Sequence, residues 1–598
     1  MTSRTPPAVG PAVPVPTALP AEPREASVRP GTVATTGSAQ RSSSFRATTG
    51  PSPYRVAIVG GGPRGLWALQ ELSQSLADSP SLGPVAVTLF EPHPTPGAGW
   101  IYAPVQPSTL RMNLANRHID CSGGEGRSFV EWLAESDAAS TLALSSEDRA
   151  TDGFAPRATV GRYLGACFRK TVASLPPTVS LRVERARVTR CARRGSSWSL
   201  KSDRRWLRFD DVLLTIGHAG SGPAAGPPAD VAGIFPVCER LSEERVAPGS
   251  DVAIRGFALT GIDAVLSLTE GRGGRFERVG QTPTNPGRLL YHASGREPRT
   301  IRPFSRTGQP MAVKPSACVN NAAGANLIWA RGLDALREAP PSVAVIEALV
   351  IDAAAARYKL DRGPQRMMTD GLWQRLLRRS RTPAIRVSVA DDWRASLREA
   401  RRQDSIGEDQ ALGAAWRMLY PAIVEAVSYG GLPEAEVARF RRMATRFERF
   451  AFGPPQPSVE RLLALIEAGL VVFDNAAGPS VERSGDGWQV GDAHVQTLVD
   501  ARVAAAGVRD LPPDGLLADL IMRGLIDVDD NWDAIVSQPD GSVADHLAVI
   551  GRVAEGNVLG HDTLTRTMHD QIPRWAASVA DRVASQQTAS VPLAAVAR

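Results

Sequence analysis

The stretch from Tyr54 to Gly65, YRVAIVGGGPRG, decides the fold of the first part of this chain. Its first half is a short β-branched run, which predicts a strand, and its glycines predict a tight turn. After the turn, leucines recur at helical spacing, and Pro63 stands where a first-turn proline costs no hydrogen bond. The sequence therefore predicts a strand that passes through a glycine turn into a helix.

The three spaced glycines of this turn are typical of a nucleotide-binding loop. Gly60 permits the tight turn, Gly62 lets the backbone approach a pyrophosphate, and Gly65 allows the helix to pack closely on the strand. The amides at the helix N-terminus would then hold the phosphates. The alternative interpretation is a glycine turn without a nucleotide.

A second strand, Val85–Phe90, follows the helix and ends at Glu91. A strand–helix–strand unit of this kind needs a parallel sheet. An acidic residue at the end of the second strand can accept hydrogen bonds from a ribose. Glu91 comes late, at 91 − 60 = 31 positions after Gly60, and the polar stretch 78–84 accounts for the extra length as a loop.

The same pattern recurs later in the chain. The run 251–255 predicts a strand, Gly256 and Gly261 flank the following turn, and Ala258 replaces the middle glycine. Its methyl group slightly limits how closely a phosphate can approach. Asp263 falls in the first helical turn, where it either stabilises the helix dipole or contacts a cofactor. We therefore predict an α/β fold with two Rossmann-like dinucleotide-binding domains.

Composition narrows the class of protein. The chain has 598 residues, 43% hydrophobic and 22% charged, and its 68 basic and 62 acidic side chains leave a net charge of only +6, which does not favour nucleic acid. No run approaches the ~18 apolar residues that span a bilayer, and no signal segment opens the chain, so a cytoplasmic protein is expected. The five cysteines form no Cys-x-x-Cys, which argues against a dithiol redox pair, and we expect them to be reduced, buried and structural.

Several further motifs occur in a fixed order along the chain: Pro96-Gly-Ala-Gly-Trp100, Leu110-Arg-Met-Asn-Leu114, Phe129-Val-Glu-Trp-Leu133, Pro156-Arg157, Gly161-Arg-Tyr-Leu164, Leu214-Thr-Ile-Gly-His218, Ser294-Gly-Arg-Glu-Pro298 and Ser305-Arg-Thr-Gly-Gln-Pro310. With the two glycine turns, they resemble the FAD/NAD(P)-binding flavoproteins with two dinucleotide-binding domains. Within these, the sequence is similar to flavin-dependent N-hydroxylating monooxygenases of the nitrosuccinate-forming aspartate type. Ile216 and Ala258 depart from the family pattern.

The resemblance implies a split FAD domain with an inserted NAD(P)H domain and a helical insertion. We expect a disordered tail at 1–50, with an organellar transit peptide as the alternative, and a first FAD-domain part at 51–250. The NAD(P)H domain is expected at 251–330, the helical insertion at 331–470, and the returning FAD segment with a C-terminal helix at 471–598.

The implied function is an FAD- and NADPH-dependent monooxygenase that uses O2 to oxygenate the nitrogen of a small amine or amino acid, with L-aspartate as the most concrete substrate. Two dinucleotide folds in one chain point independently to hydride transfer from a nicotinamide to a flavin. The alternatives are a flavin-dependent reductase with an acceptor other than O2, and a non-catalytic dinucleotide sensor. The sequence leaves open whether the chain forms a homo-oligomer, and it predicts no nucleic-acid or membrane partner.

Two loops supply candidate residues: Asn113 and His218 for catalysis, and Asn116 for cofactor binding. Asn113 and Asn116 belong to the loop 97–116, which follows the strand expected to hold the FAD ribose and is placed to cross toward the isoalloxazine; they could equally fix the loop by bonding its backbone. His218 follows a strand and is either an acid/base group or a packing residue beside the flavin. Gly217 in the same motif is expected at the cofactor. A C-terminal strand ends at Gly551, which we assign to the returning FAD segment.

Arginines are the remaining candidates. Arg302 and Arg306 follow the second unit where a 2′-phosphate would lie, which favours NADPH over NADH unless both are solvated loop residues. Arg111, Arg117 and Arg157 could clamp a substrate carboxylate or form structural ion pairs. No histidine pair has metal-ligand spacing, so no metal is assigned.

Overall fold

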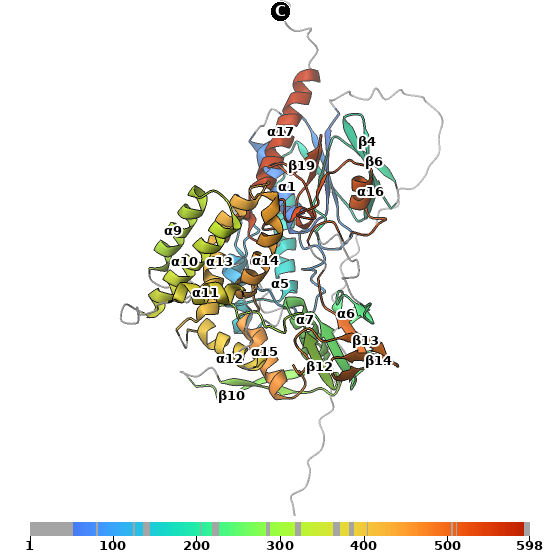
Figure 1. Ribbon diagram of the computed structural model, residues 1–598. Helices are drawn as coiled ribbons and strands as arrows, with labels where there is room; N and C mark the ends of the chain where they lie inside the picture. Colours follow the sequence, from blue (N-terminus) through green and yellow to red (C-terminus); the bar gives the residue numbers. More distant parts are fainter. Residues whose placement is uncertain are drawn as a thin grey trace, which may run out of the picture. The chain divides into compact units, whose positions relative to one another are not determined.

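The computed structural model describes residues 52–78, 82–123, 126–135, 144–203, 205–217, 227–282, 287–316, 324–362, 371–381, 388–402, 405–503, 506–509, 511–561 and 563–590 (Figure 1). The tail expected at residues 1–50 lies outside these ranges. His218 also lies outside them, so its expected catalytic role stays a prediction.

The first sheet has six strands in the order β19-β20-β7-β1-β2-β3. All neighbouring strands are parallel except β19 and β20. The strands are β1 (Tyr54–Val59), β2 (Val85–Phe90), β3 (Val179–Glu184), β7 (Asp211–Leu214), β19 (Ser542–Ala544) and β20 (Leu547–Val549). Because its last two strands come from the end of the chain, this domain is split in the sequence, as predicted.

Strand β1 shows why the sheet must be covered on both faces. Val56 and Ile58 point into one apolar core, while Ala57 and Val59 point into another. The first core is built with α1 (Pro63–Ala77), α5 (Arg157–Ala173) and α17 (Gln571–Ser590). The second is built with α16 (Leu516–Met522) and an antiparallel sheet of β4 (Val188–Arg194), β5 (Ser197–Ser202) and β6 (Trp206–Phe209). Because both faces of this parallel sheet are buried, its strands are near-continuous apolar runs in the sequence.

The second sheet has four parallel strands in the order β12-β9-β16-β8. They are β8 (Val231–Ala232), β9 (Asp251–Arg255), β12 (Thr300–Phe304) and β16 (Thr497–Asp500), and α7 (Leu259–Leu268) follows β9. The boundary predicted at residue 471 is therefore too early, because β16 still pairs with β9 in this domain. The boundary predicted at 251 is too late, because β8 already belongs to this sheet. A short apolar run does not reveal which of two sheets it joins, since that choice depends on distant pairing.

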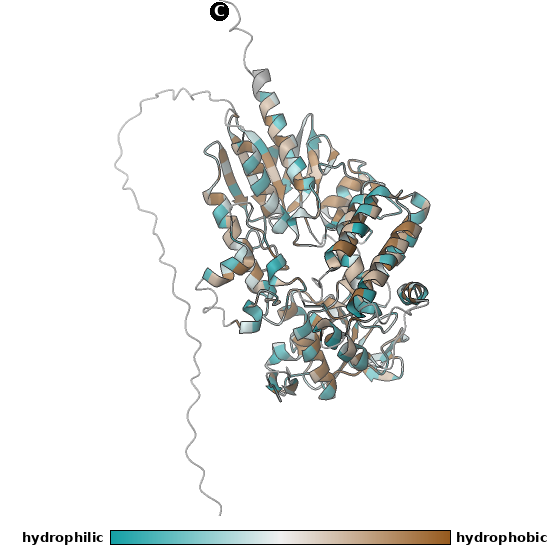
Figure 2. Ribbon diagram, turned by 90° about the vertical axis from the view of Figure 1, so that its left-hand side faces the viewer, coloured by the Kyte–Doolittle hydropathy of each residue, from teal (hydrophilic) through white to brown (hydrophobic). Residues whose placement is uncertain are grey.

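The helical insertion has its own core, to which α9 (Ala325–Glu338), α10 (Val343–Arg362), α11 (Leu372–Arg381), α13 (Glu408–Val427) and α14 (Glu434–Ala451) contribute. Trp416 and Leu419 are fully buried there. Two other helices, α12 (Val389–Ala400) and α15 (Gln456–Glu467), instead pack on the second sheet through Trp393 and Leu462. Figure 2 shows apolar and polar residues alternating along the helices, as one-sided burial requires.

Smaller elements complete the chain. They are α2 (Phe129–Glu135), α4 (Ser146–Arg149), α6 (Val237–Arg240), β10 (Arg275–Val279), β11 (Arg288–His292), β13 (Val481–Ser484), β14 (Gly487–Val490), β15 (Ala493–Val495), β17 (Val528–Asp529), β18 (Ala534–Ile535), and the 3-10 turns η1 (Asn116–His118), η2 (Glu270–Arg272), η4 (Arg552–Ala554) and η5 (Arg566–Met568). Among the helices of the described ranges, none has both the length and the hydropathy needed to cross a membrane.

Candidate functional site

Two glycines of the first turn hold strand β1 and helix α1 together. Gly60 has φ = +109°, and a Cβ there would lie 2.4 Å from the Thr215 carbonyl oxygen. A Cβ on Gly65 would lie 2.0 Å from the Gly60 carbonyl oxygen. Both positions are therefore closed to any side chain, and they fix the turn where α1 begins.

The surroundings of Gly62 differ from those of Gly60 and Gly65. Gly62 precedes α1 with ordinary extended backbone, and a Cβ there would meet only the Gly99 Cα atom, at 3.8 Å. The space beside Gly62 is thus open, and no side chain caps the first turn of α1. Helix amides that no side chain caps, beside an open backbone, form the cradle that a pyrophosphate requires, so the residues fit a dinucleotide.

Glu91 stands at the end of β2, next to this cradle. Its side chain is buried, and its two carboxylate oxygens accept hydrogen bonds from the backbone N–H of Gly61 and of His93, each at 2.8 Å. Each oxygen has a second acceptor site. The carboxylate is therefore already oriented and can still accept a ribose hydroxyl.

The second glycine turn repeats this geometry. Gly256 has φ = +106°, and a Cβ on Gly261 would lie 2.1 Å from the Gly256 carbonyl oxygen. The Gly256 N–H donates to the Phe304 carbonyl at 2.9 Å, just as the Gly60 N–H donates to the Phe90 carbonyl at 3.0 Å. Ala258 takes the place of Gly62 ahead of α7. Both units are therefore built as dinucleotide-binding turns.

This correspondence shows which residue of the second unit matches Glu91. Since Phe304 matches Phe90, Ser305 matches Glu91, and Arg306 follows it with an exposed side chain. Arg302, by contrast, lies within β12 and forms an ion pair with Asp474. Of the two predicted arginines, Arg306 is thus the one placed at the strand end.

The two asparagines of the loop 97–116 differ. Asn116 is fully buried, and its side-chain amide donates to the Asp148 and Ala150 carbonyls, both at 2.8 Å, while its Oδ1 accepts from the Ala155 N–H. Its two N–H groups are therefore used within the protein, which favours the loop-fixing interpretation over the predicted cofactor contact. The Asn113 side chain is half-buried and makes no hydrogen bond in the part of the chain that the structure describes.

The C-terminal segment returns to the first glycine turn. The Ile550 N–H donates to the Leu214 carbonyl at 3.0 Å, and a Cβ on Gly551, with φ = +137°, would lie 3.6 Å from the Arg64 Cδ atom. This places Gly551 beside the start of α1. At Gly217, with φ = +73°, an added Cβ would meet none of the described residues within 4 Å. The structure thus gathers Gly60, Gly65 and Gly551 around one helix N-terminus.

A pair of histidines that the sequence analysis missed lies behind this turn. Arg64 donates to the His561 carbonyl at 2.6 Å, and the ring nitrogens of His561 and His569 are 3.1 Å apart. Burial, with repulsion from Arg64, lowers the pKa of His561 well below its usual value and that of His569 to about 3. Both rings are therefore neutral. Their eight-residue spacing gives no metal or catalytic pattern, so only the fold reveals them.

The three arginines considered as carboxylate clamps all have resident partners. Arg111 pairs with Asp148, and Arg117 pairs with Asp152. Arg157 pairs with Asp263 at 2.7 Å, although burial still raises the pKa of that carboxyl. The ion-pair interpretation therefore fits all three, and Asp263 binds a neighbouring arginine.

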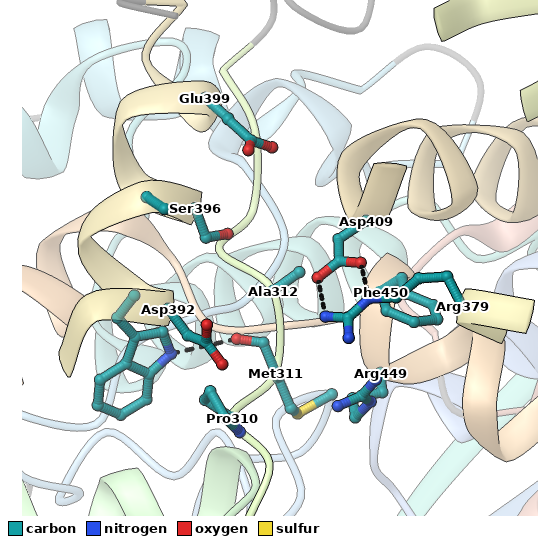
Figure 3. Close-up of a pocket in the computed structure, with 12 residues that line it drawn as sticks. Pro310, Met311, Ala312, Arg379, Asp392, Ser396, Glu399, Asp409, Arg449 and Phe450 are labelled. Carbon is teal, nitrogen blue, oxygen red and sulfur yellow. Dashed lines mark hydrogen bonds and ion pairs between the residues drawn. The ribbon is translucent and has the colours of Figure 1, made fainter. Parts of the chain in front are cut away.

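A polar pocket lies between the segment 310–312 and helices α11 to α14 (Figure 3). It encloses about 450 Å³, including space open to solvent. On one side Arg379 binds both carboxylate oxygens of Asp409, at 2.6 and 2.7 Å. The Trp393 indole N–H, also in the lining, donates to the Met311 carbonyl at 3.2 Å.

The described residues also bear on the expectations for metal ligands and cysteines. Over the described ranges, no three His, Cys, Asp or Glu side chains gather as metal ligands would. Cys121, Cys167 and Cys191 are buried free thiols, but Cys238 is exposed, so the expectation that all cysteines are buried is wrong for that residue. Cys318 lies outside the described residues.

Two glycine turns of one geometry, each ending a parallel strand and opening a helix, define a protein with two dinucleotide-binding domains. Residues 57–219 match the family model described as FAD-NAD(P)-binding. This part of the chain is therefore an FAD-NAD(P)-binding domain.

Curated relatives are similar to the chain over a longer range. It is 29% identical to a nitrosuccinic acid synthase of Aspergillus oryzae over 80% of this chain and 82% of the relative. It is 32% identical to a nitrosuccinate-forming L-aspartate N-monooxygenase of Streptomyces cremeus, over 43% and 42% of the two chains. Among solved structures, an ornithine N-hydroxylase of Kutzneria sp. 744 matches 90% of this chain and 100% of its own, with 14% identity and a TM-score of 0.46.

Proposed function

We propose that this protein is an FAD- and NADPH-dependent monooxygenase that oxygenates the nitrogen of L-aspartate and forms nitrosuccinate. The observation that carries the proposal is the similarity to a nitrosuccinic acid synthase along 80% of the chain. The repeated glycine turn supports it, since one domain could hold FAD and the other the nicotinamide dinucleotide.

When bound, FAD would accept a hydride from NADPH and activate O2 for transfer to nitrogen. The chain's own contribution begins with binding. The open backbone at Gly62 and the first amides of α1 would hold the pyrophosphate, and Glu91 would accept a ribose hydroxyl. The glycines at 60 and 65 keep this cradle in shape.

The second domain would select NADPH. Ser305 occupies the position where the first domain has Glu91, so no carboxylate repels a 2′-phosphate there. The exposed guanidinium of Arg306 can bind that phosphate with two parallel hydrogen bonds. This pairing of a neutral residue and a cation favours NADPH over NADH.

Asn113 is the proposed catalytic residue that the structure describes. Its side chain is half-buried and has hydrogen-bonding capacity to spare, on the loop that passes Gly62 at Gly99. There it would orient the reacting groups through hydrogen bonds and exclude water from the space between them. The substrate amine must lose its proton before it reacts, because an ammonium nitrogen has no lone pair.

The test is product analysis with labelled oxygen. Purified protein with FAD, NADPH, L-aspartate and 18O2 should yield nitrosuccinate that carries 18O, with NADPH consumption coupled to product. L-Ornithine and a simple amine serve as comparison substrates. A reductase that uses another acceptor would oxidise NADPH without labelled product, and that outcome would remove the proposal.

A further inference from the structure

Lys314 lies where three parts of the chain meet. It belongs to the segment 310–316, which runs from the second sheet toward the helical insertion. Its backbone N–H donates to the Pro454 carbonyl at 2.9 Å, and the preceding Val313 carbonyl accepts from Gln410 on α13 at 2.7 Å. The backbone at Lys314 is therefore fixed by the helices.

The side chain of Lys314 reaches the first domain. Its ammonium group donates a hydrogen bond to the backbone carbonyl of Asn113. Asn113 lies on the loop that passes the pyrophosphate cradle. Its own side chain is the proposed catalytic one. An ammonium group has three N–H donors, so Lys314 retains donors beyond this single contact.

The surroundings of Lys314 are cationic. Burial and repulsion from Arg417 on α13 lower the pKa of Lys314 to about 7, and burial lowers that of Arg417 to about 10. His118 on η1 is also affected by Lys314. Burial, and the positive charges of Arg117 and Lys314, lower the pKa of His118. In the part of the chain that the structure describes, Lys314 forms no ion pair with a carboxylate.

Other cations near the same loop differ in this respect. Arg111, Arg117 and Arg157 each contact an aspartate of the protein. Taking a cation out of water without a resident anion is costly, and such a position usually has a function that repays it. As a whole residue, Lys314 is half-buried.

We propose that Lys314 and Arg417 form a carboxylate-binding subsite that recognises the acidic side chain of the amino-acid substrate beside Asn113. The inference rests on the proposed function and extends it, since it names the groups that select a short acidic amino acid over a basic or neutral one. A carboxylate bound there would receive N–H donors from the Lys314 ammonium and supply the missing counter-charge. The amine would remain free to be oxygenated.

The experiment compares Lys314→Gln, Lys314→Arg and the surface control Arg378→Gln, all as FAD-loaded full-length enzyme. Loss of one charged contact costs about 1.5 to 3 kcal/mol, so Lys314→Gln should raise the KM for L-aspartate roughly ten- to hundredfold. Lys314→Arg should recover most of this loss, and Arg378→Gln should behave as wild type. Calorimetry with succinate, which has the carboxylates but no amine, should show the same order of affinity.

The succinate-binding measurement distinguishes failure of this inference from failure of the proposed function. If the wild type oxygenates L-aspartate and Lys314→Gln leaves both KM and succinate affinity unchanged, the subsite is wrong and the function stands. If no amino acid is oxygenated, the function fails, yet succinate binding that depends on Lys314 still supports the subsite. No succinate binding by the wild type overturns it.

A lower kcat with unchanged KM, not restored by arginine, would assign Lys314 to proton transfer and also overturn the proposal. FAD content and circular dichroism verify folding of each variant. Arg417→Gln is measured in parallel and carries the same expectation for KM and succinate affinity, so the question is answered even if Lys314→Gln does not fold.

Discussion

At the residue scale, the glycines of the first turn have separable roles. Gly62→Val should keep the fold, because its Cβ would meet only the Gly99 Cα at 3.8 Å, but its side chain would fill the cradle and weaken FAD binding at least tenfold, about 1.4 kcal/mol. Gly65→Val should instead destabilise the protein, because its Cβ would clash with the Gly60 carbonyl at 2.0 Å. Flavin absorbance and thermal unfolding distinguish the two. Full FAD content in Gly62→Val would show that the cradle lies elsewhere.

Arg306 offers a second test at this scale. Without its bidentate contact to the 2′-phosphate, Arg306→Ala should raise the KM for NADPH roughly ten- to hundredfold and leave the KM for NADH and the FAD content unchanged. Arg275→Ala, which removes another exposed arginine of this domain, is the control. Equal use of NADH and NADPH by the unmodified protein would contradict the assignment.

At the scale of elements, the histidine pair behind α1 should make the protein sensitive to acid. His569 has a pKa of about 3 when folded, against about 6.5 when unfolded, so the unfolded state binds more protons between these values. The stability that each neutral ring contributes is complete above pH 6.5 and is lost as the pH falls toward 3. By pH 5 the loss should reach about 2 kcal/mol for His569.

Urea unfolding at pH 7 and pH 5 measures this effect. His569→Gln should reduce the difference in unfolding free energy between the two pH values, whereas the exposed His292→Gln should not. An unchanged difference in His569→Gln would mean that the ring is protonated in the folded state.

At the scale of the whole molecule, the junction at Lys314 predicts a pH dependence of substrate binding. Lys314 is cationic below its pKa of about 7 and neutral above it, so succinate affinity should fall as the pH rises through this value. The charged neighbour Arg417 remains protonated, and the lowered pKa of His118 keeps that ring neutral around pH 7. Lys314→Arg should abolish the fall, as titration calorimetry from pH 6 to 9 would show.

The same junction predicts how Asn113 contributes to coupling. Asn113→Ala should let NADPH oxidation continue but release more hydrogen peroxide and less oxygenated product, because a hydrogen-bonding group at the reacting centre is lost. Assays of peroxide and product per NADPH measure this. Unchanged coupling would assign Asn113 only to the shape of the loop.

The sequence by itself determined the α/β class, both glycine turns and the helical insertion, because each rests on local rules. A tight turn before a helix needs glycine at Gly60 and Gly256, and buried parallel strands need short apolar runs. Each of these patterns involves only a few neighbouring residues, so it can be interpreted without knowing the rest of the fold.

Which sheet β16 joins, which arginine stands at the end of β12, and that Lys314 forms no ion pair among the described residues could be learned only from the three-dimensional structure. These depend on residues far apart in the chain, such as Phe304 with Gly256 and Lys314 with Asn113. Sequence spacing carries no information about such contacts. Long-range packing therefore assigned Asn116 to the loop and brought Lys314 to the side of Asn113.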